Sequence, residues 1–328
     1  MISDKKYGLG IINPLSQIKV ENNFSAPIIK TKSKTINKSK LIGTLIKNEN
    51  RLDTLHYKNC KKTVIEIEGK KDLIIIEQTN KDNNAHHLLI TGKENSEASI
   101  FLEIKGNSKI STLFVEIIAE KNSKINYYEL NELKSGFIYA KRLAHTEENS
   151  EVNFLITENG AEKIFSETKT LLKGKNSSTT IKSLQFSNKQ FSDIKLEAEH
   201  ANKNTKSDLK SKSALKNSIA FIRGLVKINT DAEDSDGYQK TDTLILENSR
   251  AVSIPDLLIH NDKVRCSHGS TTSTLDEEKL FYMRSRGLTT EQASLELLEG
   301  FFEPELKDIK NPEILPRILS SILERVKQ

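Results

Sequence analysis

Short apolar runs rich in β-branched residues recur from about residue 42 to residue 262. Runs at 63–67, 99–104 and 152–156 are typical, with partial alternation of apolar and polar positions. That period is typical of β-strands that bury one face. Because no long helical stretch separates the runs, the pattern argues against a doubly wound α/β fold and predicts a mainly β protein.

The dipeptide Asn-Ser recurs between these runs, at 95–96, 107–108, 122–123, 149–150, 176–177, 217–218 and 248–249. Asparagine tolerates left-handed backbone, and both side chains bond to nearby backbone, so the dipeptide indicates a turn. The intervals from 122 to 149 and from 149 to 176 are equal, as whole turns of a coiled stack would be. The repeat favours a β-solenoid over an antiparallel sandwich with Asn-rich turns.

The spacing of apolar residues becomes helical after residue 274. Residues 274–277 fit a capping box, and Gly287 fits the position just after the first helix. Residues 289–292 repeat the capping pattern, and Gly300 is predicted to close the second helix.

A third helix is predicted from Asn311, as its N-cap, and Pro312, as its first residue. We expect its apolar stripe to face a core rather than form an exposed partner groove; the stripe comprises Ile314, Leu315, Ile318, Leu319, Ile322, Leu323 and Val326. These elements predict three segments: a weakly structured lead-in at 1–41, a β-helix core at 42–273, and a small helical domain at 274–328.

Composition narrows the classes of protein. The 328 residues carry a formal charge of +5, and lysines are interleaved with acids, so we expect no nucleic-acid surface. No run approaches the roughly 20 apolar residues that span a bilayer, and the first residues lack the apolar region of a signal peptide. We therefore expect a cytoplasmic protein. Cys60 and Cys266 lie far apart and predict no disulfide framework.

Motifs for catalysis are scarce. The sequence contains no phosphate-binding P-loop, no G-x-S-x-G and no H-E-x-x-H. A carbohydrate-active β-helix enzyme remains an alternative that needs two converging carboxylates, drawn from acids such as Glu66, Glu103, Glu116, Asp193 and Glu197. Convergence of any pair depends on folding, so the spacing of these acids supports no particular pair.

Histidines and cysteines offer two places for a metal. His86 and His87 are adjacent in a predicted strand and should point to opposite faces, so we expect surface or edge histidines rather than a shared site. Cys266 and His268 are two residues apart and share a strand face. Thiolate and imidazole both bind iron, although a buried structural cysteine and a structural histidine are the alternative.

The block from 255 to 287 runs strand, Cys266-Ser267-His268-Gly269, capped helix, Leu-Phe-Tyr and Ser-Arg-Gly. This order resembles the C-terminal block of the SufB/SufD scaffold proteins of iron–sulfur cluster assembly. The resemblance covers roughly residues 195–305, with further matching segments at 200–207, 221–224 and 242–255.

The resemblance implies a right-handed parallel β-helix with flanking helices and a non-enzymatic scaffold role. It implies a SufB-like paralogue bound through the β-helix end, about 240–270, and a SufC-type ATPase bound through the C-terminal helices, about 276–305. An isolated chain would be a possible homodimer. The implied cofactor is a transient iron–sulfur cluster or iron shared with the partner, none of it tightly bound by this chain alone.

Within that family the sequence is closer to SufD. Thr241 stands where SufB proteins carry a functional cysteine, and Gly269 stands where they carry a glutamate. The resemblance makes His268 the candidate iron or cluster ligand at the partner junction, with Cys266 a weak second. The alternative is a SufB-like or homodimeric scaffold that accepts sulfur directly on Cys60 or Cys266. Residues 1–40 are too short for the N-terminal helical domain of longer members.

Overall fold

The computed structural model describes residues 41–79, 82–307, 309, 311 and 313–326. It also places the backbone of four short N-terminal strands: β1 Lys6–Tyr7, β2 Ile11–Ile12, β3 Phe24–Ser25 and β4 Ile28–Thr31. Apart from Leu41, the rest of the predicted lead-in at 1–41 lies outside the described residues.

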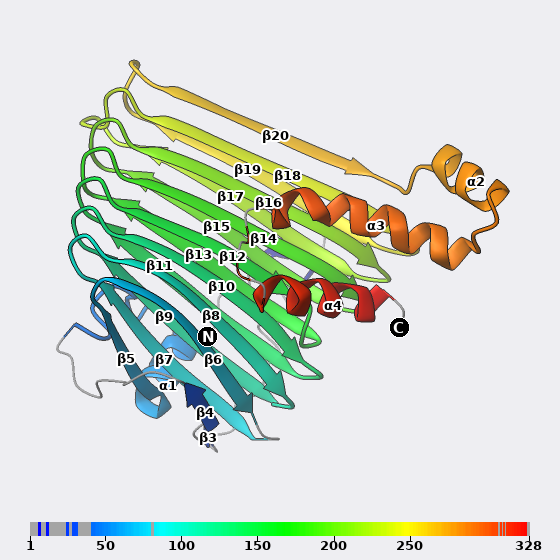
Figure 1. The fold of residues 1–328 in the computed structure, drawn as a ribbon, viewed down its shortest axis with the longest axis horizontal. Helices are drawn as coiled ribbons and strands as arrows, with labels where there is room; N and C mark the ends of the chain where they lie inside the picture. Colours follow the sequence, from blue (N-terminus) through cyan, green and yellow to red (C-terminus); the bar gives the residue numbers. More distant parts are fainter. Residues whose placement is uncertain are drawn as a thin grey trace.

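Two facing sheets form a parallel β-solenoid, in which successive strands alternate between the sheets (Figure 1). One sheet contains β4 and the even strands β6 Lys70–Thr79, β8 Glu97–Gly106, β10 Lys124–Leu133, β12 Glu151–Glu158, β14 Ser178–Asn188, β16 Lys206–Lys216, β18 Asp236–Leu246 and β20 Arg265–Ser273. The other contains β3 and the odd strands β5 Lys61–Ile67, β7 Asn83–Gly92, β9 Ile110–Ala119, β11 Phe137–Thr146, β13 Lys163–Leu172, β15 Phe191–His200, β17 Ile219–Ile228 and β19 Arg250–Ile259. The predicted solenoid is confirmed, and the antiparallel sandwich is wrong.

The recurring asparagines stack along one edge of the solenoid. Asn95, Asn122, Asn149 and Asn176 all adopt left-handed backbone, with φ between 56° and 61°. The side-chain amides of Asn122, Asn149 and Asn176 each donate to the asparagine 27 residues earlier, over N–O distances of 2.9–3.1 Å. Later turns of the solenoid contain 28 to 30 residues, which explains why the Asn-Ser spacing loses its regularity.

The inside of the solenoid changes character along its length. Aliphatic side chains such as Ile65, Leu88 and Ile100 fill the first turns. In the last turns the inward positions include hydroxyl side chains such as Ser211 and Thr243, both of them buried. Apolar burial therefore stabilises the N-terminal turns more strongly than the C-terminal ones.

Three helices follow the solenoid: α2 Glu277–Ser285, α3 Thr290–Leu306 and α4 Ile314–Val326. Helices α3 and α4 cover the outer face of the even sheet (Figure 1). The capping box at Thr289 and Gln292 is confirmed, and so is Gly287 just after α2, with φ +100°.

Two predicted helix boundaries are wrong. The N-cap of α2 is Asp276, whose side chain accepts from the Lys279 N–H, and not Thr274. Helix α3 also continues through Gly300 to Leu306. A glycine inside a helix costs only about 1 kcal/mol, and burial of Phe302 and Leu306 against the sheet outweighs that cost.

The third helix begins close to its predicted start. Asn311 accepts from the Glu313 N–H through its side chain, as an N-cap does. Ile314, Ile318 and Ile322 are buried against the even sheet, so the stripe faces a core as predicted.

A further helix, α1 Arg51–Asn59, was not predicted. Asn50 caps it by accepting from two backbone N–H groups, and α1 packs against the outer face of the odd sheet near β7. Its mean hydropathy is low, and its apolar positions are few, so the segment lacked the amphipathic pattern that predicts a helix.

Candidate functional site

The Cys266-Ser267-His268-Gly269 segment lies on β20, the last strand of the even sheet. Cys266 is half-buried, pairs in register with Gly237 and packs against the solenoid core. His268 pairs in register with Gln239 and is exposed. Side chains alternate along a strand, so His268 lies on the same face of β20 as Cys266, at the open end of the solenoid.

This end of the solenoid is uncapped in the described residues. Strand β19 pairs only with β17, and β20 pairs only with β18, which leaves two free strand edges. The exposed fractions of the Ile254, Leu258 and Ile259 side chains are 38%, 43% and 42%. Free edges flanked by apolar side chains are a template for association with another chain.

Thr241 lies in β18 beside this end, in register with Ser270 of β20. The Ser270 hydroxyl donates to the Ser253 hydroxyl of β19 over 3.0 Å, which joins the two sheets across the last turn. The inward positions next to His268 on β18 and β20 are therefore polar, and the His268 side chain itself is exposed.

Neither cysteine is an activated thiol. Burial, with a smaller contribution from Asp236, raises the pKa of the Cys266 thiol. Burial also raises the pKa of the Cys60 thiol, although Lys62 opposes this shift. The nucleophile and metal ligand is the thiolate, and the solenoid environment alone does not favour it at either position.

Helix α2 extends beyond the solenoid and contacts α3 (Figure 1). Its Phe281 and Tyr282 side chains are 74% and 58% exposed, the highest values among the large apolar side chains of the described residues. Two adjacent exposed aromatic side chains on a projecting helix indicate a surface for a partner.

The expectation of surface or edge histidines at 86 and 87 is wrong, because both side chains are fully buried. They do point to opposite faces. His86 points into the solenoid, where its Nδ1 lies 2.8 Å from Glu77 and its Nε2 lies 3.0 Å from Thr63. His87 points outward, where the unpredicted helix α1 covers it.

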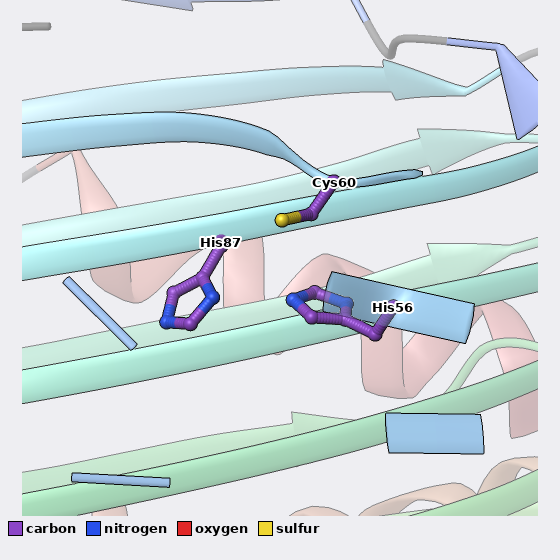
Figure 2. Close-up of side chains that lie close together, drawn as sticks. All are labelled: His56, Cys60 and His87. Atoms are coloured by element: carbon purple, nitrogen blue, oxygen red, sulfur yellow. The ribbon is translucent and has the colours of Figure 1, made fainter. Parts of the chain in front are cut away.

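His87 belongs to a group that sequence reasoning missed. His56 and Cys60 from the end of α1 join it, and ligand atoms of the three residues all lie within 4.8 Å of one another (Figure 2). The signal was present in the sequence as a His-x₃-Cys spacing, which places both side chains on one face of a helix. In the described part of the chain this is the only such group, so Cys266 and His268 have no third ligand there.

Four of the five acids considered for a carbohydrate-active enzyme are engaged elsewhere, and Glu66 is exposed on β5. Glu103 binds Arg317 of α4, whereas Glu116 accepts three backbone N–H groups of residues 43–46. Asp193 pairs with Arg223, and Glu197 lies between two lysines. Glu103 lies on the even sheet and the other three on the odd sheet, held by structural partners rather than paired across a cleft.

Comparison with known proteins shows to which family the chain belongs. Residues 74–301 match the model of the family described as SUF system FeS cluster assembly, SufBD core domain. The chain belongs to the SufBD family. Its predicted likeness to SufB/SufD proteins is thereby confirmed, and the match extends well upstream of the segment that carried the resemblance in the sequence.

Three relatives show how similar this SufBD chain is to curated proteins and how much of each protein it covers. It is 31% identical over 215 residues to the iron-sulfur cluster assembly SufBD family protein ycf24 of Antithamnion sp., over 62% of this chain and 72% of that protein. It is 29% identical over 210 residues to a SufBD family protein of Staphylococcus epidermidis, and 29% identical over 206 residues to one of Staphylococcus haemolyticus. Those matches cover 63% and 62% of this chain, but only 45% and 44% of the staphylococcal proteins.

The SufBD family makes this chain an iron–sulfur cluster assembly protein. Among the described residues, no helix has both the length and the apolar character needed to cross a bilayer.

Proposed function

We propose that this SufBD chain is a SufD-like scaffold subunit that builds iron–sulfur clusters together with a SufB-like paralogue and a SufC-type ATPase. The observation that carries the proposal is the uncapped end of the solenoid, where His268 and two free strand edges lie together. The threonine at 241 and the glycine at 269 favour the SufD side of the family.

The SufB-like partner would pair with the edges of β19 and β20. Backbone N–H and C=O groups on these edges offer hydrogen bonds, and the exposed side chains of Ile254, Leu258 and Ile259 add apolar area. A second copy of this chain would use the same edges when the paralogue is missing.

His268 would bind iron or a cluster at the junction between the two subunits. An exposed imidazole is a good ligand for iron, but one imidazole does not hold a cluster, so the other ligands must come from the partner. The iron or cluster is therefore cargo shared across the junction, and Cys266 remains a weak second candidate because its half-buried thiol faces the core.

The ATPase would bind at α2 and the start of α3. Phe281 and Tyr282 provide an exposed aromatic pair, and Arg286 lies over the Tyr282 ring at 5.2 Å. Aromatic and arginine side chains are the residue types enriched in interface cores.

The alternative scaffold, which accepts sulfur directly on a cysteine of this chain, is less well supported. Sulfur acceptance needs a reactive thiolate, and burial raises the pKa of both thiols. Mass spectrometry after incubation with a cysteine desulfurase tests it, and a persulfide on Cys60 or Cys266 would favour this alternative.

The decisive experiment is purification of the complex from the native cell, followed by cluster reconstitution. We expect His268→Ala to retain both partners and lose most of its cluster yield. His260→Ala is the matched control, because His260 is an exposed histidine at the same end of the solenoid. Normal cluster yield in His268→Ala would refute the assigned role of His268.

A second variant tests the pairing surface. Leu258→Asp places a charge at the β19 edge, and we expect it to abolish pairing with the paralogue without changing the urea midpoint of the isolated chain. A complex that survives Leu258→Asp, Ile254→Asp and their combination would refute pairing through this end.

A further inference from the structure

The group formed by His56, Cys60 and His87 belongs to α1 and β7, which lie at the opposite end of the solenoid from β20, the strand that carries His268 (Figure 1). His56 lies in the last turn of α1, and Cys60 is the C-cap, whose N–H donates to the His56 carbonyl. Strand β7 supplies His87 from the outer face of the sheet. Two separate elements thus bring three metal-binding side chains together.

Hydrogen bonds fix which nitrogen of His56 is available. The Thr112 hydroxyl donates to the Asn84 carbonyl, so it accepts from the Nδ1–H of His56 at 2.9 Å. The His56 Nε2 is therefore unprotonated, and this buried atom has no hydrogen-bond partner. An unpartnered lone pair in a fully buried ring is costly unless something binds it.

His87 repeats this arrangement from the other side. Its Nε2 lies 3.4 Å from Glu116, a buried carboxylate, while its Nδ1 has no hydrogen-bond partner. Figure 2 shows the inner nitrogen of His87, the His56 ring and the Cys60 sulfur directed toward a common space. A carboxylate or hydroxyl behind each imidazole is the usual support of a metal-binding histidine.

We propose that His56 Nε2, His87 Nδ1 and Cys60 Sγ bind a divalent transition-metal ion of borderline softness, for which Zn²⁺ is the reference. In tetrahedral coordination the three ligand atoms would be about 3.3–3.6 Å apart. The present separations reach at most 4.8 Å, so closure needs movements of about 1 Å or less on binding. The fourth position is open to water on the half-buried Cys60 side.

The aromatic surroundings give the alternative explanation of this cluster. The His56 ring stacks on Phe114 at 3.7 Å between ring centroids, and Tyr57 packs against both His87 and Phe114. Packing alone explains why the rings are buried. It does not explain why the His56 Nε2 and the His87 Nδ1 beside one thiol both lack hydrogen-bond partners, and a bound metal ion does.

Metal binding would fasten α1 to the solenoid. The free energy of binding adds to folding when the ligands come together only in the native state. The site is independent of the cluster junction, because it uses neither Cys266 nor His268. The result of testing this metal site therefore neither supports nor refutes the proposed scaffold role, which has separate tests.

The experiment uses the full chain, stripped with a chelator and titrated with Zn²⁺ against a chromophoric indicator. We expect one equivalent to bind the wild type and Cys266→Ser, the matched cysteine control. Cys60→Ser and His56→Gln should weaken binding by about 100-fold or more, and Thr112→Val by about 10-fold or more. Replacement with Co²⁺ should give a thiolate-to-metal charge-transfer band that Cys60→Ser removes.

Thermal unfolding provides a second readout for each variant. Added Zn²⁺ should raise the unfolding temperature of the wild type and of Cys266→Ser, but not that of Cys60→Ser. Failure of the wild type to bind one equivalent would overturn the proposal. Binding that survives Cys60→Ser and His56→Gln, or that requires Cys266 or His268, would overturn it as well.

Discussion

Arg142 offers a sharp test of how charged side chains are held inside the solenoid. It is fully buried on β11, and its guanidinium binds Glu129 through two nitrogens and lies 3.3 Å from Glu158. Burial alone would lower the pKa of Arg142, but the two carboxylates outweigh burial and raise it, so the group stays charged. We predict that Arg142→Met strongly destabilises the protein.

The magnitude follows from what the substitution leaves behind. Removing one partner of a buried ion pair costs about 3–5 kcal/mol, because the remaining charge is uncompensated. Here two buried carboxylates remain. Tyr127 still donates to Glu129 at 2.8 Å and Asn131 to Glu158 at 3.3 Å, but these neutral donors do not balance the charge. We therefore expect a loss of about 3–5 kcal/mol.

Urea unfolding followed by circular dichroism and by tyrosine fluorescence measures this loss. The triple variant Arg142→Met/Glu129→Gln/Glu158→Gln removes the stranded charges, and we expect it to recover at least about 2 kcal/mol. Lys124→Met is the surface control. Lys124 pairs with Glu151 at 2.9 Å on a half-exposed surface, so this change should cost at most about 1 kcal/mol.

Two results would contradict this account of the interior. One is a loss in Arg142→Met no larger than that in Lys124→Met. The other is a triple variant that is no more stable than Arg142→Met alone, because the cost would then come from lost packing and not from uncompensated charge.

Two further predictions concern the turns and the pH dependence. Asn149→Ala should cost about 1–2 kcal/mol in urea unfolding, since φ is 56° there, and Asn149→Gly should restore part of the loss; equal midpoints for the two variants would refute the backbone explanation. Burial lowers the pKa of His200 to about 4, against an ordinary value of 6.5. As pH falls, His200 is protonated in the unfolded chain before it is protonated in the folded one. The folded state therefore keeps its full stability above pH 6.5 and loses about 3 kcal/mol of it as pH falls to 4. His200→Gln should flatten that stretch of the stability curve, and parallel wild-type and variant curves would exclude His200 as the cause.

The strand runs in the sequence were readable because one face of each strand is buried. The runs at 63–67, 99–104 and 152–156 lie within β5, β8 and β12, but no such run was recognised in β11, β13 or β16. In β13, Lys163–Leu172, the buried positions include Ser166, Thr168 and Thr170, so even its inward face lacks a continuous apolar pattern. The stack supplies neighbours on both sides, so weakly apolar segments still form strands there.

Of the two candidate sites, one could be singled out from the sequence and the other could not. His268 could be singled out because its block resembles a known family, although its role is still a prediction. The group of His56, Cys60 and His87 could not, because α1 has a weak helical pattern and His87 comes from a strand 27 residues beyond Cys60. Local spacing indicated only the His56–Cys60 half of it.

The sequence by itself determined the solenoid, its Asn-based turns, the C-terminal helices and the family. Strands, helices and solenoid turns repeat with periods of 2, 3.6 and about 27 residues, and such repeats can be recognised in the sequence. Tertiary structure decided which histidines are buried, where the edges of the last strands are free, and which ligands meet. Each of these depends on contacts between residues far apart in the chain, as when α1 folds back over β7 and turns a strand histidine into a buried one.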